Sequence, residues 1–290
     1  MQLIDGKQTS QEVKDEIKAE VELIKSKGGK IPHLAAILVG EDGASKTYVG
    51  SKVKSCEYVG FESTLYKMDE STSEEKLLAK IEEINNNDDI DGLIVQLPLP
   101  AHISVEKVTE TIAPEKDVDG FHLVNLGRMI AGKKTFLPAT PFGITMLLDK
   151  YGIETKGKHC VIVGRSHIVG TPMSMLMNRP YDCTVTLAHR YTENLAEHTR
   201  SADILIVAVG IPEFIKADQV KDGVTVIDVG ITRVPDESNP RGYVIKGDVA
   251  FDEVSEKASY ITPVPGGVGP MTIASLLKNT LLSAKKEIYS

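Results

Sequence analysis

The hydrophobic pattern of the first hundred residues alternates between the spacing of a helix and that of a buried strand. Residues 8–27 place apolar side chains three or four positions apart, which predicts an amphipathic helix that ends at Gly28-Gly29. Residues 34–40 and 91–97 are apolar runs of strand length, typical of strands buried on both faces. The elements expected between these strands are a helix at 44–59, a strand at 61–66 and a helix at 73–86. This alternation predicts a mostly parallel sheet.

The second half of the chain repeats the alternation with the features of a nucleotide-binding domain. Strands are expected at 160–163, 183–187, 204–209 and 224–229, and a glycine follows each of the last two. Strands separated by helices in this way are typical of a doubly wound, Rossmann-like sheet. We predict a two-domain α/β fold with a first domain over 1–138, a dinucleotide-binding domain over 139–272 and a helix at 273–290 that packs back on the first domain. A ligand is expected in the cleft between two such domains.

Composition and charge exclude several classes of function. The 290 residues carry 33 Lys and Arg against 41 Asp and Glu, and the resulting formal charge of −8 would repel a nucleic-acid backbone. The apolar runs are far shorter than the roughly 20 residues that span a bilayer, and the N-terminus lacks the pattern of a secretory signal, so we expect a cytoplasmic protein without a membrane segment. Cys56, Cys160 and Cys183 show no metal-ligand spacing, which predicts buried free thiols and no metal site.

A candidate cofactor loop spans residues 164–170. It has glycine at both ends and leads into a helix whose N-terminus could offer backbone N–H groups to a pyrophosphate. The spacing departs from GxGxxG, with Ser166 in place of the middle glycine, so a plain strand-to-helix turn is also compatible. The next strand is followed by His189-Arg190, without the carboxylate of a typical NAD site. Arg165 and Arg190 would suit a 2′-phosphate, although either could be a solvated surface charge.

Side chains suited to acid–base chemistry stand together on the helix expected at 44–59. Ser45, Tyr48 and Lys52 are spaced three and four positions apart, so all three project from one face of the helix. A phenol and an amine would then meet in one volume. A solvated polar face is the commoner meaning of this spacing when it is found alone.

Three further polar segments are candidates for a binding site. Gln96 lies within the apolar run 93–100 and needs hydrogen-bond partners, which are either backbone groups alone or a side chain that it orients in a cleft. Residues 116–120 place two carboxylates, Asp117 and Asp119, around a turn that ends in glycine. Residues 263–270 form a loop rich in proline and glycine that a flat ligand could approach closely. Each of the last two could also be a simple turn.

Five segments together resemble the bifunctional methylenetetrahydrofolate dehydrogenase/cyclohydrolase family. They are Tyr48-Val-Gly-Ser-Lys52, Val95-Gln-Leu-Pro-Leu-Pro100, Lys116-Asp-Val-Asp-Gly-Phe121, Gly164-Arg-Ser-His-Ile-Val-Gly170 and Pro263-Val-Pro-Gly-Gly-Val-Gly-Pro270. Their order and spacing follow the family from about residue 1 to 285. The resemblance implies oxidation of 5,10-methylenetetrahydrofolate with NADP, hydrolysis of the methenyl product to 10-formyltetrahydrofolate, and a homodimer. It also implies that the first domain binds folate and the second binds NADP.

The resemblance implies a role for each matching residue. Lys52 corresponds to the catalytic lysine, Gln96 to the glutamine that tunes it, and Tyr48 to the tyrosine that positions the folate. Asp119 corresponds to the carboxylate that pairs with the pterin ring, and completes the predicted catalytic set. The other predicted substrate-binding positions are Leu97, Pro98, Pro265, Gly266 and Gly267, and the predicted cofactor-binding positions are Gly164, Arg165, Ser166, Arg190 and Ile231.

Three positions depart from the family pattern. Arg190 stands where a serine usually contacts the 2′-phosphate and is expected to replace it, while Leu123 and Ala139 stand where proline and cysteine are common. The alternatives to a bifunctional enzyme are a dehydrogenase without hydrolytic activity and a folate- or nucleotide-binding regulatory protein. The former would lack Lys52 or Gln96, and the latter would have a broken dinucleotide loop; neither is the case. An amino-acid dehydrogenase would share the nucleotide-binding half alone.

Overall fold

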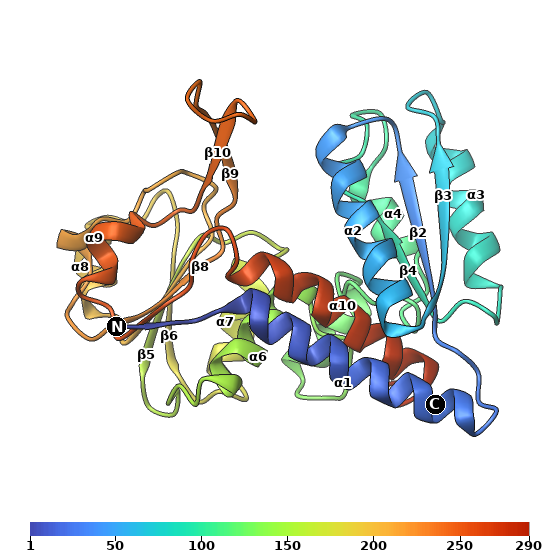
Figure 1. Ribbon diagram of the computed structural model, residues 1–290, viewed down its shortest axis with the longest axis horizontal. Helices are drawn as coiled ribbons and strands as arrows, with labels where there is room; N and C mark the ends of the chain where they lie inside the picture. Colours follow the sequence, from blue (N-terminus) through green and yellow to red (C-terminus); the bar gives the residue numbers. More distant parts are fainter. Residues whose placement is uncertain (290) are drawn as a thin grey trace. The chain divides into compact units, whose positions relative to one another are not determined.

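The computed structural model describes residues 1–289, apart from the side chain of Ala44, and divides into two compact units (Figure 1). One unit contains a three-stranded sheet and comprises Gln11–Ala139 with the C-terminal segment from Ile273. The other contains a six-stranded sheet and comprises Met1–Ser10 with Thr140–Thr272. The sheet contents and the alternation of strands and helices confirm a two-domain α/β fold.

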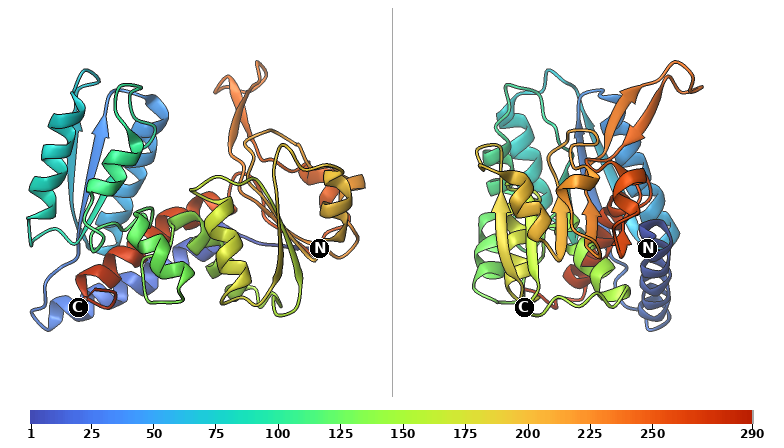
Figure 2. Two further views of the ribbon diagram at one scale, coloured as in Figure 1. Left: turned by 180° about the vertical axis from the view of Figure 1, so that it is seen from behind. Right: turned by 90° about the vertical axis from the view of Figure 1, so that its left-hand side faces the viewer.

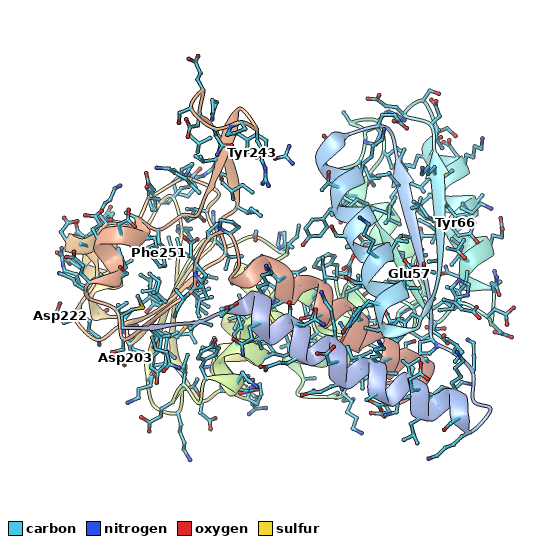
Figure 3. The ribbon with its side chains drawn as sticks, viewed as in Figure 1. Glu57, Tyr66, Asp203, Asp222, Tyr243 and Phe251 are labelled. Atoms are coloured by element: carbon cyan, nitrogen blue, oxygen red, sulfur yellow. The ribbon has the colours of Figure 1, made fainter. Side chains whose placement is uncertain are left out.

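The three-stranded unit has a parallel sheet in the order β3-β2-β4, formed by Glu62–Met68, His33–Val39 and Gly92–Val95. The central strand β2 is buried on both faces, as its apolar run predicts. Leu34, Ala36 and Leu38 join a core with helices α1 (Gly6–Ser26), α2 (Gly43–Val59) and α10 (Val268–Ala284). The alternate residues Ala35, Ile37 and Val39 join a second core with α3 (Glu74–Asn85) and α4 (Val105–Thr111). Helices α2 and α3 therefore cover opposite faces of the sheet (Figure 1). Tyr66 of β3, labelled in Figure 3, contacts Lys80 of α3.

The six-stranded unit is a parallel sheet in the order β1-β11-β8-β7-β5-β6. Its strands are Gln2–Leu3, Tyr260–Ile261, Thr225–Asp228, Ile204–Val207, His159–Val163 and Thr184–Ala188. The helices of this unit are α6 (Ala139–Lys150), α7 (Gly170–Asn178), α8 (Leu195–Ser201) and α9 (Phe251–Ser255), with a short 3₁₀ helix at Ala217–Gln219. The strand order reverses at β5, since β6 lies on one side of it and β7 on the other. In doubly wound sheets, nucleotides bind at the carboxyl ends of the strands where the order reverses.

Several elements differ from those expected from the sequence. Strand β1 pairs in parallel with β11, so the first ten residues lie with the six-stranded unit and not with the domain expected over 1–138. An antiparallel hairpin of β9 (Thr232–Pro235) and β10 (Tyr243–Lys246), absent from the expected elements, projects from this unit (Figures 2 and 3). Its strands are short and half-exposed, and therefore lack a clear apolar period. Helix α10 begins at Val268, five residues before the predicted start.

The remaining helix of the three-stranded unit is α5 (Leu123–Ile130), which His122 caps by accepting a hydrogen bond from Val124 N–H.

All three cysteines are free and buried, which confirms the prediction of buried free thiols. No helix among the described residues is both long and apolar enough to cross a membrane.

Candidate functional site

Helix α2 presents Tyr48 and Lys52 one turn apart. The helix starts at Asp42, whose carboxylate accepts the Ser45 N–H at 2.7 Å, and ends at Gly60 in the left-handed conformation at φ 82°. Lys52 is 6% exposed, and its Nζ lies 5.3 Å from the centre of the Tyr48 ring. The spacing of these two residues therefore marks a buried face here and not a solvated one.

Gln96 connects the end of β4 to this lysine. Its backbone N–H continues the sheet by donating to Ile37 O at 2.9 Å. Its side-chain amide donates to Leu97 O at 2.6 Å, which leaves Oε1 to accept from Lys52 Nζ at 3.3 Å. Gln96 therefore does not bond backbone groups alone, since it also accepts a hydrogen bond from the Lys52 side chain. Leu97 and Pro98 follow directly after it.

The two carboxylates of the 116–120 turn have different environments. Asp117 is buried, and its carboxylate accepts the backbone N–H groups of Gly120, Phe121 and His122 at 3.1, 3.2 and 2.8 Å. Gly120 has φ 75°, and a side chain there would meet the backbone of Leu137 and Pro138 at 2.6 Å. Asp117 therefore shapes the turn, while Asp119 is half-buried.

Burial controls the charge of both carboxylates. Burial raises the pKa of Asp119, and the positive charge of Lys52 offsets only part of that rise. Burial also raises the pKa of Asp117 to about 7, against the effect of the hydrogen bonds that it accepts. The interaction with Lys52 brings Asp119 into the same cluster as Tyr48 and Gln96. The four predicted catalytic residues all belong to the three-stranded unit.

The predicted folate-binding loop at Pro265, Gly266 and Gly267 belongs to the six-stranded unit. Gly266 has φ 111°, and its carbonyl accepts Lys7 N–H at 2.8 Å. A side chain at Gly267 would meet Pro263 O at 2.6 Å, and one at Gly6 would meet Gly267 O at 1.8 Å. Gly267 and Gly6 therefore have no room for a side chain, whereas Gly266 is favoured by its positive φ.

The candidate cofactor loop turns sharply between β5 and α7. Gly164 has φ 113°, and a side chain at this position would meet Ala208 O at 2.2 Å. A side chain at Gly170 would meet Gly164 O at 1.8 Å, so both end glycines are required by the turn. Ser166 Oγ accepts Val169 N–H at 3.1 Å inside the loop. The loop borders a cavity of about 790 Å³ at the carboxyl ends of β5 and β7, whose lining includes Gly164, Arg165, Ser166, His189 and Arg190.

Two arginines share one aromatic ring at the rim of this cavity. The guanidinium groups of Arg165 and Arg190 lie 5.8 and 4.7 Å from the centre of the Tyr191 ring. Both arginines and Tyr191 are exposed. The residues that line the cavity include no carboxylate. Two neighbouring guanidinium groups without a competing acid suit a phosphate group.

Two buried carboxylates beneath the cofactor loops did not stand out in the sequence. Asp248 Oδ2 accepts the N–H groups of Val209 and Gly210 at 2.6 and 2.9 Å, just beyond the end of β7 at Val207. Asp228 accepts N–H groups of Gly230, Asp248 and Val249, each at 2.9 Å, and burial raises its pKa to about 6. The segment leads to Ile231, the predicted cofactor contact, whose side chain is 64% exposed. For Asp228, the available signal in the sequence was a carboxylate at the end of an otherwise apolar strand.

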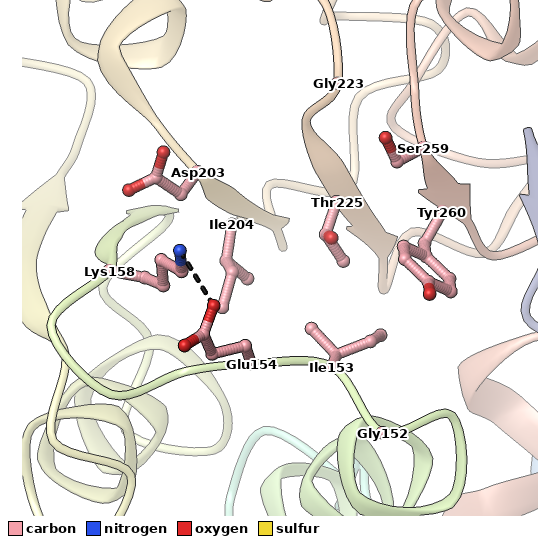
Figure 4. A pocket seen from close by; sticks show the side chains of 10 residues that line it. All are labelled: Gly152, Ile153, Glu154, Lys158, Asp203, Ile204, Gly223, Thr225, Ser259 and Tyr260. Atoms are coloured by element: carbon pink, nitrogen blue, oxygen red, sulfur yellow. Dashed lines mark ion pairs between the residues drawn. The ribbon is translucent and has the colours of Figure 1, made fainter.

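A second cavity of the six-stranded unit, about 330 Å³, lies at the opposite ends of the strands (Figure 4). It contains the starts of β7, β8 and β11, and the ion pair between Lys158 and Glu154 at 2.9 Å. Ligands of doubly wound sheets bind at the carboxyl ends, so this cavity is not the cofactor site. Within the described part of the chain, no group of three His, Cys, Asp or Glu side chains could hold a metal ion.

Comparison with known proteins identifies the family to which these sites belong. The catalytic-domain model of the tetrahydrofolate dehydrogenase/cyclohydrolase family matches residues 4–119, and its NAD(P)-binding-domain model matches residues 138–288. The chain is 65% identical over 288 residues to the "Bifunctional protein FolD" of Flavobacterium johnsoniae, and the match covers 98% of both chains.

Solved structures agree with the sequence comparison. The bifunctional methylenetetrahydrofolate dehydrogenase/cyclohydrolase of Campylobacter jejuni is 48% identical with a TM-score of 0.94, and the match covers 99% of both chains. The corresponding enzyme of Trypanosoma brucei, solved with NADP cofactor and an inhibitor, is 36% identical with a TM-score of 0.94, over 100% of this chain and 99% of that one. The chain belongs to the tetrahydrofolate dehydrogenase/cyclohydrolase family.

Proposed function

We propose that this chain oxidises 5,10-methylenetetrahydrofolate to the methenyl form with NADP and then hydrolyses the methenyl form to 10-formyltetrahydrofolate. Membership of the family supports both activities. The observation that carries the hydrolytic half is the buried Lys52 amine, held by Gln96 at 3.3 Å and close to the charge of Asp119. A dehydrogenase alone would need no such amine.

Lys52 is proposed to act as the base of the hydrolytic step. Water adds to the methenyl carbon and must lose a proton, and the neutral amine of Lys52 can accept that proton. Gln96 Oε1 accepts from the amine and therefore fixes where its lone pair can point. The Tyr48 ring, 5.3 Å from Nζ, is a flat apolar surface on which a folate ring could stack.

Asp119 is proposed to anchor the pterin ring. A carboxylate on a rigid turn can accept hydrogen bonds from an amine and an adjacent amide at the same time. Leu97 and Pro98, next to Gln96, are proposed to border the ring. Pro265, Gly266 and Gly267 are assigned to folate binding by their match to the family, and the two glycines carry no side chain that would prevent a ligand from approaching the backbone.

The cavity beside Gly164 fits NADP. The turn between β5 and α7 lines the cavity through Gly164, Arg165 and Ser166, and Arg165 and Arg190 provide positive charge for a 2′-phosphate. Ile231 is proposed to contact the cofactor through its backbone. When bound, NADP accepts the hydride of the substrate; the chain's own part in that step is to align the two ligands.

Three further features belong to the proposal. We infer a homodimer from the resemblance to the family. The three free, buried cysteines support a reducing compartment such as the cytoplasm. The net charge of −8 argues against nucleic acid as a partner.

The test is an absorbance assay on the purified chain. Methenyltetrahydrofolate formation is followed from methylenetetrahydrofolate with NADP and then with NAD, and the decay of isolated methenyltetrahydrofolate is followed without cofactor. We expect turnover in both assays and faster oxidation with NADP. A chain that oxidises the substrate but leaves methenyltetrahydrofolate to decay at the uncatalysed rate would be a dehydrogenase alone.

A further inference from the structure

A chain of hydrogen bonds joins the C-terminal tail to the turn that carries Asp119. Tyr289, beyond the end of α10, bonds through its hydroxyl to Asn125 Oδ1 at 2.6 Å. Asn125 Nδ2 donates to Asp117 Oδ2 at 2.8 Å. Asp117 accepts the three backbone N–H groups of the turn, and Asp119 lies inside that turn. All of these residues belong to the three-stranded unit.

The direction of the hydrogen bonds at Asn125 is fixed by its neighbours. Its Nδ2 also lies 3.0 Å from Pro114 O, which can only accept, so this atom is the amide nitrogen. Oδ1 must then accept, and the hydroxyls beside it are Tyr289 at 2.6 Å and Thr135 at 2.7 Å; Thr135 Oγ1 also lies 3.2 Å from Asn125 O. The side chain is fully buried. The tail hydroxyl therefore completes the hydrogen bonding of a buried amide.

Buried networks of this kind hold geometry tightly because each unmade bond leaves a polar atom without water. Asn125 and Asp117 are 0% and 2% exposed, so neither can turn to solvent when a partner is lost. The backbone around Asp119 is held from the other side as well, since Asn279 Nδ2 donates to Val118 O at 2.9 Å and Ala139 N–H donates to Asp119 O at 3.1 Å. Because Asn125 bonds Asp117 and Asp117 bonds the turn, a shift at Asn125 acts on the turn through Asp117.

The tail is seated by more than its hydroxyl. The Tyr289 ring lies 5.9 Å from the ring of the buried Phe136, and the Arg128 guanidinium is 4.7 Å from its centre. Removing the hydroxyl alone should leave these ring contacts in place. The hydroxyl and the packing of the tail can thus be separated by experiment.

We propose that Tyr289, acting through Asn125 and Asp117, is a positioning residue for Asp119, so that the C-terminal tail sets the affinity of the site for the pterin ring. The inference rests on the proposed function, in which Asp119 binds that ring. Hydrogen bonds between a carboxylate and two adjacent donors tolerate little displacement, so a small change in the turn should appear in folate binding before it appears in overall stability.

The experiment compares Tyr289→Phe with Thr135→Val and Thr135→Ser. We expect Tyr289→Phe and Thr135→Val each to raise the KM for methylenetetrahydrofolate about two- to tenfold, the range given by the loss of one neutral hydrogen bond. Thr135→Ser keeps the donor and should restore the wild-type KM. The KM for NADP and kcat should change less than twofold. Tyr181→Phe is the matched control, because it removes a tyrosine hydroxyl bonded to Asp149 at 2.7 Å in the other unit.

The outcomes separate the inference from the proposed function. If Tyr289→Phe leaves the folate KM unchanged, the role of the tail is overturned, whatever Thr135→Val does. An equal rise in the KM values for folate and NADP would also overturn it, because that pattern indicates general loosening of the fold. A wild-type chain without folate turnover would instead contradict the proposed function.

Discussion

Replacing Lys52 with methionine tests the proposed base directly. Methionine keeps much of the length and apolar character of the lysine stem, and Lys52 is 6% exposed, so the packing of α2 should persist. The amine is lost, and with it the donor to Gln96 Oε1 at 3.3 Å. Leaving that acceptor without its partner costs about 1 to 3 kcal/mol at most, which lowers the melting temperature without unfolding a chain of this size.

The loss of hydrolysis should be much larger than the loss of stability. Removal of a general base slows a reaction by about 10²- to 10⁴-fold, or about 2.7 to 5.4 kcal/mol of transition-state stabilisation. Oxidation should fall less, because it depends on the alignment of two ligands. Lys52 also lowers the pKa of Asp119, so its removal should leave Asp119 more protonated and raise the folate KM. Rates must therefore be compared at saturating folate.

The assay measures both rates on one folded preparation, with isolated methenyltetrahydrofolate for the hydrolytic step. Lys46→Met is the matched control: it removes an amine from the same helix, but one that is exposed and paired with Glu41. The control should keep both activities within about twofold, since exposed ion pairs contribute about 0 to 1 kcal/mol. A Lys52→Met variant that hydrolyses the methenyl substrate at the rate of the Lys46→Met control would refute Lys52 as the base.

Three further predictions concern the other charged groups. Arg190→Ala should lower the ratio of kcat/KM for NADP over NAD by about tenfold, the lower end of the range for a charge-assisted hydrogen bond, because Arg190 is exposed. Arg200→Ala, which removes another exposed arginine of the same unit, is the control. An unchanged ratio would remove Arg190 from the phosphate site. Asp119→Asn should weaken folate binding and reduce both activities together, and a loss confined to hydrolysis would assign Asp119 to proton transfer instead. Burial raises the pKa of Asp228 to about 6, so this group favours folding below about pH 4 and that contribution is lost as pH rises to 6. The melting temperature of the wild type relative to Asp228→Asn should therefore fall between pH 4 and 6, and a difference that stays flat or grows would contradict the raised pKa.

The sequence alone determined the features that depend on local geometry. The apolar run at 34–40 predicted a strand buried on both faces, and β2 places alternate residues in two separate cores. The spacing of Tyr48 and Lys52 predicted that they share a face of α2, because the helix repeat fixes neighbours four residues apart. Glycine at both ends of 164–170 predicted the sharp turn into α7, where side chains have no room.

Tertiary structure decided what depends on distant parts of the chain. Whether the face of Lys52 was solvated or buried depended on Gln96, which lies 44 residues further along. The different roles of Asp117 and Asp119 depended on Asn125 and the backbone that follows, and nothing in the spacing of two carboxylates distinguishes them. Strand β1 is two residues long and finds its partner at Tyr260–Ile261, so no local pattern could place it. Local patterns report the period of one element, whereas burial and partner choice arise from contacts that exist only after the chain has folded.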